Sequence, residues 1–341
     1  MISTDRSIFD KESVVAQRQI ENAKNWDQVH IVVFAEKGKY PSTLQLNNNC
    51  YVYSTESTSK FFYPWGAISV GKSIVGKNKI TEITCQDSSL TAMAGVALKS
   101  NFKIPLEIQI HGDIGSPYFA NNITNKIRLR LAKKYLPKAD KIRVVSNRIK
   151  DFVQELLDKN SKNIPIEVRP IAINEEEIKN ALVIDGSDLH KKYKQFDQIV
   201  LSASRLESEK NIDLAIEAWP AVVRDFPRAG LLIVGSGSCE DRLKKLVVQK
   251  QLQKSVIFEA WAEKKTLYSY YKTCDIFLVT SLFEGYGLTL MEAKLSGAKI
   301  ISTDVGIARE VGAEIVLHDH FDLSKKIKAV LSKNNNLGSV E

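Results

Sequence analysis

The sequence predicts two α/β domains, each built on a parallel sheet covered by helices. Short apolar runs rich in β-branched residues alternate with helical patterns along most of the chain, as is typical of parallel strands buried on both faces. The 341 residues suffice for two domains of ordinary size. A polar stretch from 174 to 198, which contains Asp185-Gly186-Ser187-Asp188, separates two such series. We therefore expect an N-terminal domain over residues 1–173 and a C-terminal domain over residues 174–341.

The first half contains the patterns of a complete α/β unit. Only Met1-Ile2-Ser3 precede Thr4-Asp5-Arg6, so a strand at the start would be short. The apolar runs predict strands at Val29–Phe34, Cys50–Tyr53, Ile80–Thr84, Leu106–Ile110, Ile142–Ser146 and Ile166–Arg169. Helical periodicity predicts helices at Glu12–Ala23, Ser89–Lys99, Asn122–Tyr135 and Arg148–Leu157.

The second half repeats the same alternation. Its predicted strands are Ile199–Ala203, Leu231–Val234, Val256–Glu259, Ile276–Thr280, Lys299–Ser302 and Ile315–Leu317. Its predicted helices are Ile212–Arg224, Glu240–Gln249, Lys264–Thr273, Leu288–Leu295 and Leu323–Leu331. The alternation of strand and helix predicts a second parallel sheet.

The composition is that of a soluble globular protein. Hydrophobic residues make up 44% and charged residues 26% of the sequence. No apolar stretch approaches the roughly 18 residues that a spanning helix needs, and the N-terminus lacks the apolar region of a signal peptide. The four scattered cysteines have no metal-binding spacing, which favours reduced thiols. We expect a cytoplasmic protein.

Positive charge is concentrated in the first half of the chain. Residues 1–175 contain 25 Lys/Arg and 17 Asp/Glu, whereas the remainder contains 23 of each. Residues 121–150 hold ten basic side chains and one acid, Asp140. This asymmetry indicates a polyanionic partner. The basic element at 123–141 is either a packed helix with a solvated face or an interfacial helix that binds anionic lipid, in which case the protein would be peripheral at the inner membrane face.

One loop in the second half carries the chemistry. Two carboxylates frame it, Glu284 in the loop and Glu292 in the helical pattern that follows. Gly285 and Gly287 let the backbone approach a ligand closely, and a helix start near Leu288 presents free N–H groups that favour a phosphate. Carboxylates repel phosphate but accept hydrogen bonds from vicinal hydroxyls. The pattern favours a nucleotide-sugar; the alternative is a solvated loop before an ordinary amphipathic helix.

Three motifs carry a family resemblance. Glu284-Gly-Tyr-Gly-Leu-Thr-Leu-Met-Glu292 resembles the Glu-x7-Glu signature of retaining glycosyltransferases of the GT-B fold, family 4, also described as glycosyl transferases group 1. The segment from Gly297 through Gly306 to Glu310 resembles the next strand and glycine turn of that family. Ser204-Arg205-Leu206-Glu207-Ser208-Glu209-Lys210-Asn211 resembles its Gly-Arg-Leu…Lys motif, with Ser204 in place of the usual glycine. The similarity covers most of residues 140–332 and implies two Rossmann-like domains facing across a cleft.

The resemblance also implies a donor site in the C-terminal domain. Glu284 would hold the donor sugar and Glu292 the ribose. Arg205 and Lys210 follow a predicted strand, where cations can stabilise the negative charge that grows on a leaving diphosphate; on its own, either could be a solvated residue at a helix start. The implied donor-binding residues are Arg205, Lys210, Glu284, Gly285, Tyr286, Gly287, Leu288 and Glu292.

The N-terminal domain would bind the acceptor. Strand Leu106–Ile110 ends in His111-Gly112-Asp113, where an imidazole can hydrogen-bond a sugar hydroxyl or move a proton. The family has a histidine at the matching strand end, so His111 joins Glu284, Arg205 and Lys210 as a catalytic candidate, with Asp113 as an acceptor contact. Asp87 either faces the same site or caps the helix after Ser89, and Ser146 is expected to be an N-cap.

Neither a metal nor a cofactor is expected, because no Asp-x-Asp pair is present and cations can neutralise the diphosphate. His318-Asp319-His320 follows a short strand and is expected to be a surface loop. Gly235-Ser-Gly237 predicts a structural βα turn, since a full dinucleotide fingerprint is absent. The chain ends soon after Lys333, where the family usually continues with helices that cross back to the first domain.

We therefore expect a retaining glycosyltransferase that moves a sugar from a nucleotide-diphosphate sugar to a glycan or lipid-linked acceptor, in polysaccharide or glycolipid synthesis. One alternative is a weak or inactive relative that binds nucleotide-sugar or a partner without turnover. A nucleic-acid-binding protein would fit the basic first half, but no aromatic stacking motif or known binding module is present, so no nucleic acid is expected. A nicotinamide oxidoreductase would need the missing fingerprint.

Overall fold

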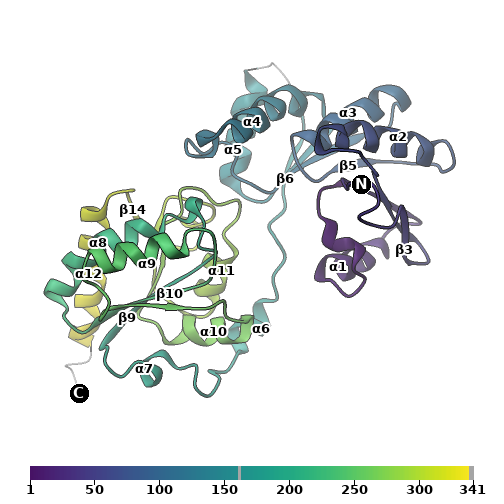
Figure 1. The fold of residues 1–341 in the computed structure, drawn as a ribbon. Coiled ribbons are helices and arrows are strands. Elements are labelled where there is room, and N and C mark those ends of the chain that lie inside the picture. The colour runs from purple at the N-terminus through teal and green to yellow at the C-terminus, as the bar shows by residue number, and fades with distance from the viewer. Residues whose placement is uncertain (160–162, 338–341) are drawn as a thin grey trace. The chain divides into compact units, whose positions relative to one another are not determined.

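The structure, a computed structural model, describes residues 1–159 and 163–337, with side chains up to residue 333. The chain forms two compact units, Met1–Pro170 and Ile171–Glu341, and each unit has its own sheet (Figure 1). The sequence placed the boundary three residues later, between 173 and 174.

The first unit contains an eight-stranded sheet in the order β3-β4-β2-β1-β5-β6-β7-β8. The strand at the chain start is as short as expected, yet it lies in the middle of the sheet, parallel to both neighbours. The sheet is parallel, as predicted, except at its edge, where β3 pairs antiparallel with β4 through a tight turn at 48–49. The strands are β1 (Ile2–Ser3), β2 (Val29–Val33), β3 (Thr43–Asn47), β4 (Cys50–Ser54), β5 (Ile83–Cys85), β6 (Leu106–Ile110), β7 (Lys141–Val144) and β8 (Ile166–Val168).

Helices cover both faces of this sheet. Helices α2, α3 and α4 lie side by side on one face and α1 covers the other (Figure 1). The sequence missed α2, because Gly66 and Gly71 weaken its helical pattern; a Cβ at Gly71 would lie 2.6 Å from a methyl carbon of Leu98 in α3, so these glycines permit close helix packing. The helices are α1 (Val14–Ala23), α2 (Tyr63–Val75), α3 (Leu90–Phe102), α4 (Ile123–Tyr135) and α5 (Asn147–Asp158), with short 3-10 turns η1 (Arg6–Phe9), η2 (Lys60–Phe62), η3 (Phe119–Asn121) and η4 (Leu136–Lys138).

The second unit contains a six-stranded, fully parallel sheet in the order β11-β10-β9-β12-β13-β14. This order makes β9 and β12 neighbours although 72 residues lie between them, so the loops after these two strands meet at the carboxyl edge. The strands are β9 (Gln198–Ala203), β10 (Ala229–Val234), β11 (Val256–Glu259), β12 (Ile276–Val279), β13 (Ile300–Thr303) and β14 (Glu314–Val316).

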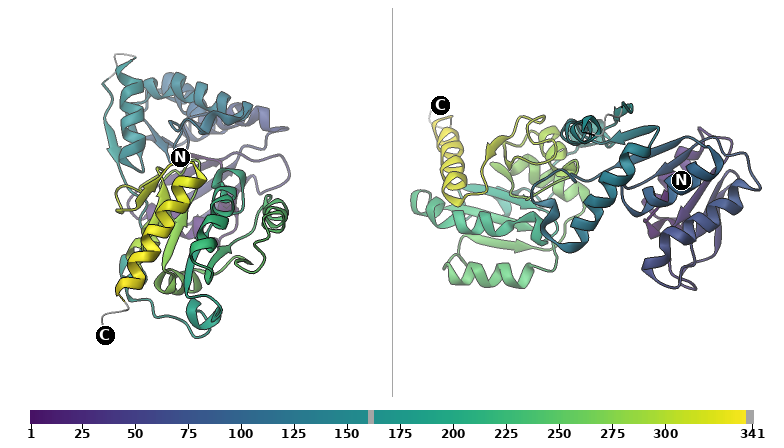
Figure 2. Two further views of the ribbon diagram at one scale, coloured as in Figure 1. Left: turned by 90° about the vertical axis from the view of Figure 1, so that its left-hand side faces the viewer. Right: turned by 90° about the horizontal axis from the view of Figure 1, so that it is seen from above.

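The helices of the second unit also lie on both faces of the sheet (Figures 1 and 2). The core on one face is centred on the fully buried Trp219 of α8, packed with α9 and α12. The helices are α8 (Ile212–Asp225), α9 (Glu240–Gln249), α10 (Lys264–Thr273), α11 (Leu288–Leu295) and α12 (His320–Leu337), with the 3-10 turn η5 (Ser208–Lys210).

The polar stretch expected to connect the two domains contains two short helices, α6 (Glu175–Asn180) and α7 (Leu189–Lys192). Asn174 and Asp188 cap them, and each helix buries one apolar side chain, Ile178 and Leu189 respectively. The sequence analysis named no helix here, because a single buried anchor leaves too weak a periodic signal in so few residues.

Candidate functional site

The candidate site is formed where the loops after β9 and β12 join. The Leu282 backbone N–H donates to the Glu209 carbonyl at 2.8 Å, and the Thr280 hydroxyl donates to the Lys210 carbonyl at 3.0 Å. The neighbouring β13 adds a third contact, since the Thr303 hydroxyl donates to the Ser281 carbonyl at 2.7 Å. These bonds fix the two loops against each other.

An ion pair joins the side chains of the two loops. Lys210 Nζ lies 2.5 Å from Glu284 Oε1, and both side chains are largely buried, with 14% and 17% of their surface exposed. The Ser281 hydroxyl donates to the same carboxylate oxygen at 2.7 Å. The carboxylate therefore has one charged and one neutral donor, and its position is determined by both loops.

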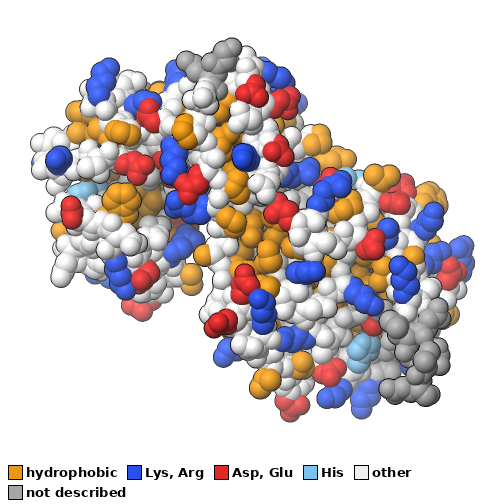
Figure 3. Space-filling view, turned by 180° about the vertical axis from the view of Figure 1, so that it is seen from behind, with side chains coloured by type: hydrophobic (Ala, Val, Ile, Leu, Met, Phe, Trp, Pro, Cys, Tyr) orange, Lys and Arg blue, Asp and Glu red, His pale blue; other side chains and the backbone are white. Residues whose placement is uncertain are grey.

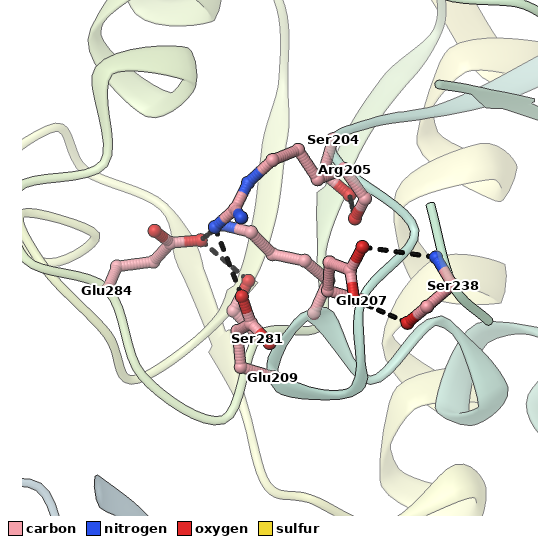
Figure 4. Close-up of polar contacts among 8 residues, drawn as sticks. Ser204, Arg205, Glu207, Glu209, Ser238, Ser281 and Glu284 are labelled. Carbon is pink, nitrogen blue, oxygen red and sulfur yellow. Dashed lines mark hydrogen bonds and ion pairs between the residues drawn. The ribbon is translucent and has the colours of Figure 1, made fainter. Parts of the chain in front are cut away.

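Arg205 approaches the same region from the β9 side. Its guanidinium nitrogen lies 3.1 Å from Glu209 Oε1, and the side chain remains 65% exposed. Figure 4 shows Arg205 and Glu284 pointing toward each other from different loops. The structure thus brings Arg205, Lys210 and Glu284 to one place, where a cation on an exposed side chain and an acid with a fixed position are both available to a ligand.

A third loop, after β10, packs directly behind Arg205. Glu207 accepts hydrogen bonds from the backbone N–H and hydroxyl of Ser238 at 3.1 and 2.5 Å (Figure 4). Gly235 has φ +142°, and a Cβ there would lie 1.9 Å from the Ser204 carbonyl oxygen. Gly235-Ser-Gly237 therefore forms a βα turn whose glycines are required by close backbone approach, as the sequence indicated.

The glycine loop before α11 has the strained backbone that its sequence suggests. Gly287 precedes the first residue of α11, Leu288, with φ +90° and ψ +61°, a left-handed conformation that disfavours any residue with a Cβ. The buried Tyr286 accepts a hydrogen bond at its carbonyl from the Ile307 N–H at 3.0 Å. Gly306 packs on the same carbonyl, since a Cβ at this position would lie 2.3 Å from it. Gly285 lies half-buried in this loop.

Glu292 lies half-buried on α11, beside α10 rather than within the Lys210–Glu284 pair. Burial raises the pKa of its carboxyl group, and Lys264 on α10 opposes this effect. Tyr268 and Tyr271 are spaced along the same helix as Lys264 at i+4 and i+7. Burial raises the pKa of both phenols, and the nearby carboxylate of Glu292 raises it further. One face of α10 thus surrounds this acid.

Tyr271 is the most closely enclosed of these neighbours. Its side chain is fully buried and its ring meets Phe277 of β12 edge-on, with 4.9 Å between ring centroids. The hydroxyl lies close enough to Glu292 for each group to affect the pKa of the other, but among the described residues it makes no hydrogen bond of good geometry. It is a donor available to Glu292 that sequence reasoning did not single out.

In the first unit, His111 and Asp87 lie at the ends of neighbouring strands β6 and β5. Although the His111 ring is exposed, desolvation by the surrounding protein lowers its pKa, and Arg143 and Arg18 lower it further. Asp87 acts in the opposite direction. The Asp87 carboxylate accepts from the Ser89 N–H and hydroxyl at 2.6 and 2.7 Å, so the structure shows the capping contact.

Asp113 does not point toward a ligand. Only 2% of its side chain is exposed, and its carboxylate accepts from Arg148 Nε at 2.9 Å. The predicted acceptor contact is corrected to a buried ion pair, which holds the loop after β6 against α5. Ser146 is the N-cap of α5, as predicted, since its hydroxyl accepts from the Ile149 N–H.

The histidine pair at 318 and 320 is split between a loop and a helix. His318 follows β14, and His320 opens α12, where Asp319 accepts from the Asp322 N–H at 2.8 Å. In the ranges 1–159 and 163–333, no three His, Cys, Asp or Glu side chains are grouped as metal ligands. Within the described part of the chain, no helix combines the length and apolarity required to cross a bilayer.

The sequence profile of the glycosyl transferases group 1 family matches residues 187–337, which include the complete Lys210–Glu284 site. The second unit belongs to this family. This match confirms, for the second unit, the family resemblance that its motifs indicated. An uncharacterized glycosyltransferase of Methanocaldococcus jannaschii is 27% identical over 252 residues, 70% of this chain and 61% of its own length. The chain therefore spans about three-fifths of that relative.

A second relative, from Campylobacter jejuni, is named N-acetylgalactosamine-N,N'-diacetylbacillosaminyl-diphospho-undecaprenol 4-alpha-N-acetylgalactosaminyltransferase. It is 28% identical over 188 residues, 55% of this chain and 47% of its own length.

Solved structures resemble both units of the chain. Sucrose-phosphate synthase from Thermosynechococcus elongatus has a TM-score of 0.76 at 19% identity and covers 97% of this chain, with 89% of its own chain matched. HepE of Anabaena in complex with UDP-glucose has a TM-score of 0.69 at 17% identity, over 98% of this chain and 90% of its own. At these identities the likeness shows the fold, and it confirms the prediction of two Rossmann-like units of the GT-B type.

Replacing Glu292 by Gln tests how much the burial of its charged carboxylate destabilises the fold. Because burial raises the pKa of Glu292, this acid stabilises the fold only when protonated, and that contribution is lost as pH rises through its folded-state value. Glu292→Gln should therefore melt no lower than the wild type at pH 7.5. Its advantage should shrink below about pH 4.5, the ordinary value for glutamate. Thermal melts across pH check this, and a clear loss of stability at pH 7.5 would contradict it.

The two glycines that bracket α11 offer a matched pair. Gly287 and Gly297 both have positive φ, at +90° and +86°, so alanine at either position should cost about 1–2 kcal/mol of unfolding free energy. A Cβ at Gly287 also lies 2.8 Å from Leu290 Cδ1, whereas Gly297 has open space. Denaturant titration should show the larger loss for Gly287→Ala. Equal losses would mean that the Leu290 contact is relieved without cost.

Proposed function

We propose that the chain is a retaining glycosyltransferase that uses a nucleotide-diphosphate sugar as donor. The observation that carries the proposal is the placement of Lys210, Arg205 and Glu284 on two cross-bonded loops of a group 1 unit. Cations and a hydroxyl-binding acid at one carboxyl edge suit a diphosphate joined to a sugar. HepE, a structural relative, is described in complex with UDP-glucose, which supports a donor of this class.

The residues divide the reaction between them. Transfer breaks the bond between the sugar C1 and the diphosphate oxygen and forms one to an acceptor oxygen, whose proton must leave. Arg205 and Lys210 would stabilise the charge that develops on the departing diphosphate. Glu284 would accept hydrogen bonds from the donor sugar, Glu292 would bind the ribose, and the backbone of Gly285, Tyr286, Gly287 and Leu288 would line the donor.

A bound donor would replace the partners of the Lys210–Glu284 ion pair. Lys210 and Glu284 form an ion pair at 2.5 Å. A diphosphate offers Lys210 a stronger anionic partner, and the sugar hydroxyls offer Glu284 replacement donors, with Ser281 remaining in place. The donor therefore exchanges one set of charge-assisted bonds for another, so neither charge is left unpaired at any stage.

The acceptor belongs to the first unit in this proposal. His111, kept neutral by its lowered pKa, would accept the proton of an acceptor hydroxyl or hydrogen-bond it, and Asp87 is the adjacent polar group. A glycan or lipid-linked acceptor is proposed, supported by the Campylobacter jejuni relative, whose name specifies an undecaprenol-linked substrate. Synthesis of a cell-surface polysaccharide or glycolipid in the cytoplasm follows as the proposed setting.

Helix α4 supports a peripheral membrane location. Ile123 and Ile127 are 77% and 51% exposed at i and i+4, and Arg130 and Lys134 continue the same stripe. An apolar stripe that runs into cations fits an anionic membrane surface. The described α4 thus combines a packed side, which includes Ala132 and Tyr135, with an exposed apolar stripe that a purely solvated face would lack.

Two other functions are less well supported. An inactive relative would retain donor binding, and turnover measurements distinguish it from an enzyme. A nucleic-acid protein would need a continuous basic surface, but Figure 3 shows acidic side chains interspersed among Lys and Arg over the face that it presents. We retain the glycosyltransferase proposal and the unproductive donor binder as its alternative.

Variants of the Lys210–Glu284 ion pair should affect the free energy of unfolding and kcat differently. Lys210→Met leaves Glu284 with Ser281 but without its cation, and should cost about 2 kcal/mol of unfolding free energy and about a hundredfold or more in kcat. Adding Glu284→Gln should restore stability but not activity. Lys250→Met, which breaks a more exposed pair with Glu217 at 2.5 Å, is the matched control. The assay screens nucleotide-sugars by thermal shift and then follows release of nucleoside diphosphate; full activity in Lys210→Met would refute the assignment.

The His111 proposal predicts a pH dependence of its own. Because its pKa is lowered, the imidazole stays neutral at pH 7 and gains a proton only below about pH 6.5, so transfer should fall on that acid side. His111→Gln should lower kcat roughly a hundredfold and remove that limb of the profile. His30, whose pKa burial also lowers, lies on β2 and hydrogen-bonds Tyr53, so His30→Gln should change neither. An unchanged pH profile of transfer in His111→Gln would contradict a catalytic role for His111.

A further inference from the structure

Three aromatic side chains stand exposed where α2 begins. Phe61, Phe62 and Trp65 expose 86%, 55% and 56% of their surfaces, and the rings of Phe62 and Trp65 meet edge-on with 6.3 Å between centroids. Single exposed apolar residues are ordinary, but three large exposed rings within five positions are not. We call these three residues the aromatic platform.

The backbone beneath the platform is fixed. A Cβ at Gly66 would lie 2.6 Å from Ser57 Oγ and 2.9 Å from the Thr55 carbonyl, so the start of α2 is pressed onto the end of β4. Between the exposed rings, Tyr63 is buried and stacks on Phe34 with 5.3 Å between centroids. The exposed rings therefore project from a rigid segment, which reduces the entropy lost when they are buried by a partner.

The helices next to the platform also begin with exposed apolar side chains. Helices α2, α3 and α4 lie side by side, and each begins at the carboxyl edge of the sheet (Figure 1). The first residue of α3, Leu90, is 37% exposed, and Ile123 opens α4 with most of its surface exposed. Exposed apolar side chains thus occur at the start of three adjacent helices.

Basic residues outnumber acidic ones beside this surface, since residues 36–65 contain Lys37, Lys39 and Lys60 against Glu36 and Glu56, and Glu36 is paired with Lys39 at 2.5 Å. Lys60 immediately precedes the platform, and the exposed Lys37 lies on a turn whose backbone N–H donates to the Ser57 carbonyl at 3.1 Å. The surrounding 1–175 segment contains eight more basic than acidic residues. Two copies joined through this surface would bring the same lysines together, so charge disfavours a symmetric dimer. An apolar, negatively charged partner suits both features.

We propose that the aromatic platform inserts into the headgroup boundary of an anionic lipid bilayer, with Lys37 and Lys60 binding lipid phosphates. Phe and Trp side chains are favoured at this depth and lysines at the charged surface. This proposal rests on the membrane location proposed for α4 and adds three aromatic side chains that enter the bilayer. Vesicle binding requires no sugar transfer, so the platform can be tested independently of the enzymatic proposal.

Cosedimentation with phosphatidylcholine vesicles, with and without phosphatidylglycerol, tests the proposal on the full chain. Changing Phe61, Phe62 and Trp65 to Ser should lower partitioning onto anionic vesicles at least about tenfold, since each ring loses its buried surface. Trp26→Ser with Phe102→Ser removes two exposed rings near the ends of α1 and α3 and should leave partitioning unchanged. Lys37→Ala with Lys60→Ala should weaken binding only to anionic vesicles. Lys126→Ala with Arg130→Ala tests α4 separately.

Fluorescence identifies the inserted residue. With Trp26→Phe and Trp261→Phe, only Trp65 and the fully buried Trp219 remain. Trp65 emission should shift to the blue on anionic vesicles and be quenched by brominated lipid. Wild-type partitioning by the aromatic variant, or unquenched Trp65, would overturn the proposal, as would a dimer detected by light scattering that the aromatic substitutions abolish. Lipid binding without any sugar transfer would instead refute the enzymatic proposal alone.

Discussion

The candidate site depends on the pairing of β9 with β12. Neighbouring parallel strands deliver their following loops to the same edge, and here those loops are joined by the Leu282–Glu209 backbone bond and the Thr280–Lys210 bond. The Lys210–Glu284 ion pair is a consequence of this arrangement, because the sheet has already brought its two ends together. Moving either strand in the order would separate acid from cation by at least one strand spacing, roughly 5 Å.

Glycines allow the loops to approach this closely. Gly235 packs on the Ser204 carbonyl and Gly306 on the Tyr286 carbonyl, at distances that no side chain permits. Gly287 then turns the chain through a left-handed conformation into α11. Each glycine lies at the end of a strand or the start of a helix, so the strain is confined to the carboxyl edge while the strands themselves remain regular.

The two acids of the signature differ in their surroundings. Glu284 is paired with Lys210 and Ser281, whereas Glu292 is half-buried beside the phenols of α10 and has a raised pKa. A single ligand that needs one acid at its sugar and another at its ribose would meet two different electrostatic environments. The Tyr271 hydroxyl lies near this second acid but, among the described residues, makes no hydrogen bond of good geometry.

The sequence by itself determined the alternation of strands and helices, the family of the second unit and the residue types of the site. These follow from periodicity and from motifs such as Glu284 to Glu292, which act over short distances along the chain. It could not determine the β3–β4 hairpin, α2 or the short helices before β9, whose signals are weakened by glycines or by brevity. Only the tertiary structure decided that Asp113 turns inward to Arg148, that Asp87 holds Ser89 and that Phe61, Phe62 and Trp65 face outward. The direction of a side chain depends on what packs against it from distant parts of the chain, and a linear pattern does not contain that information.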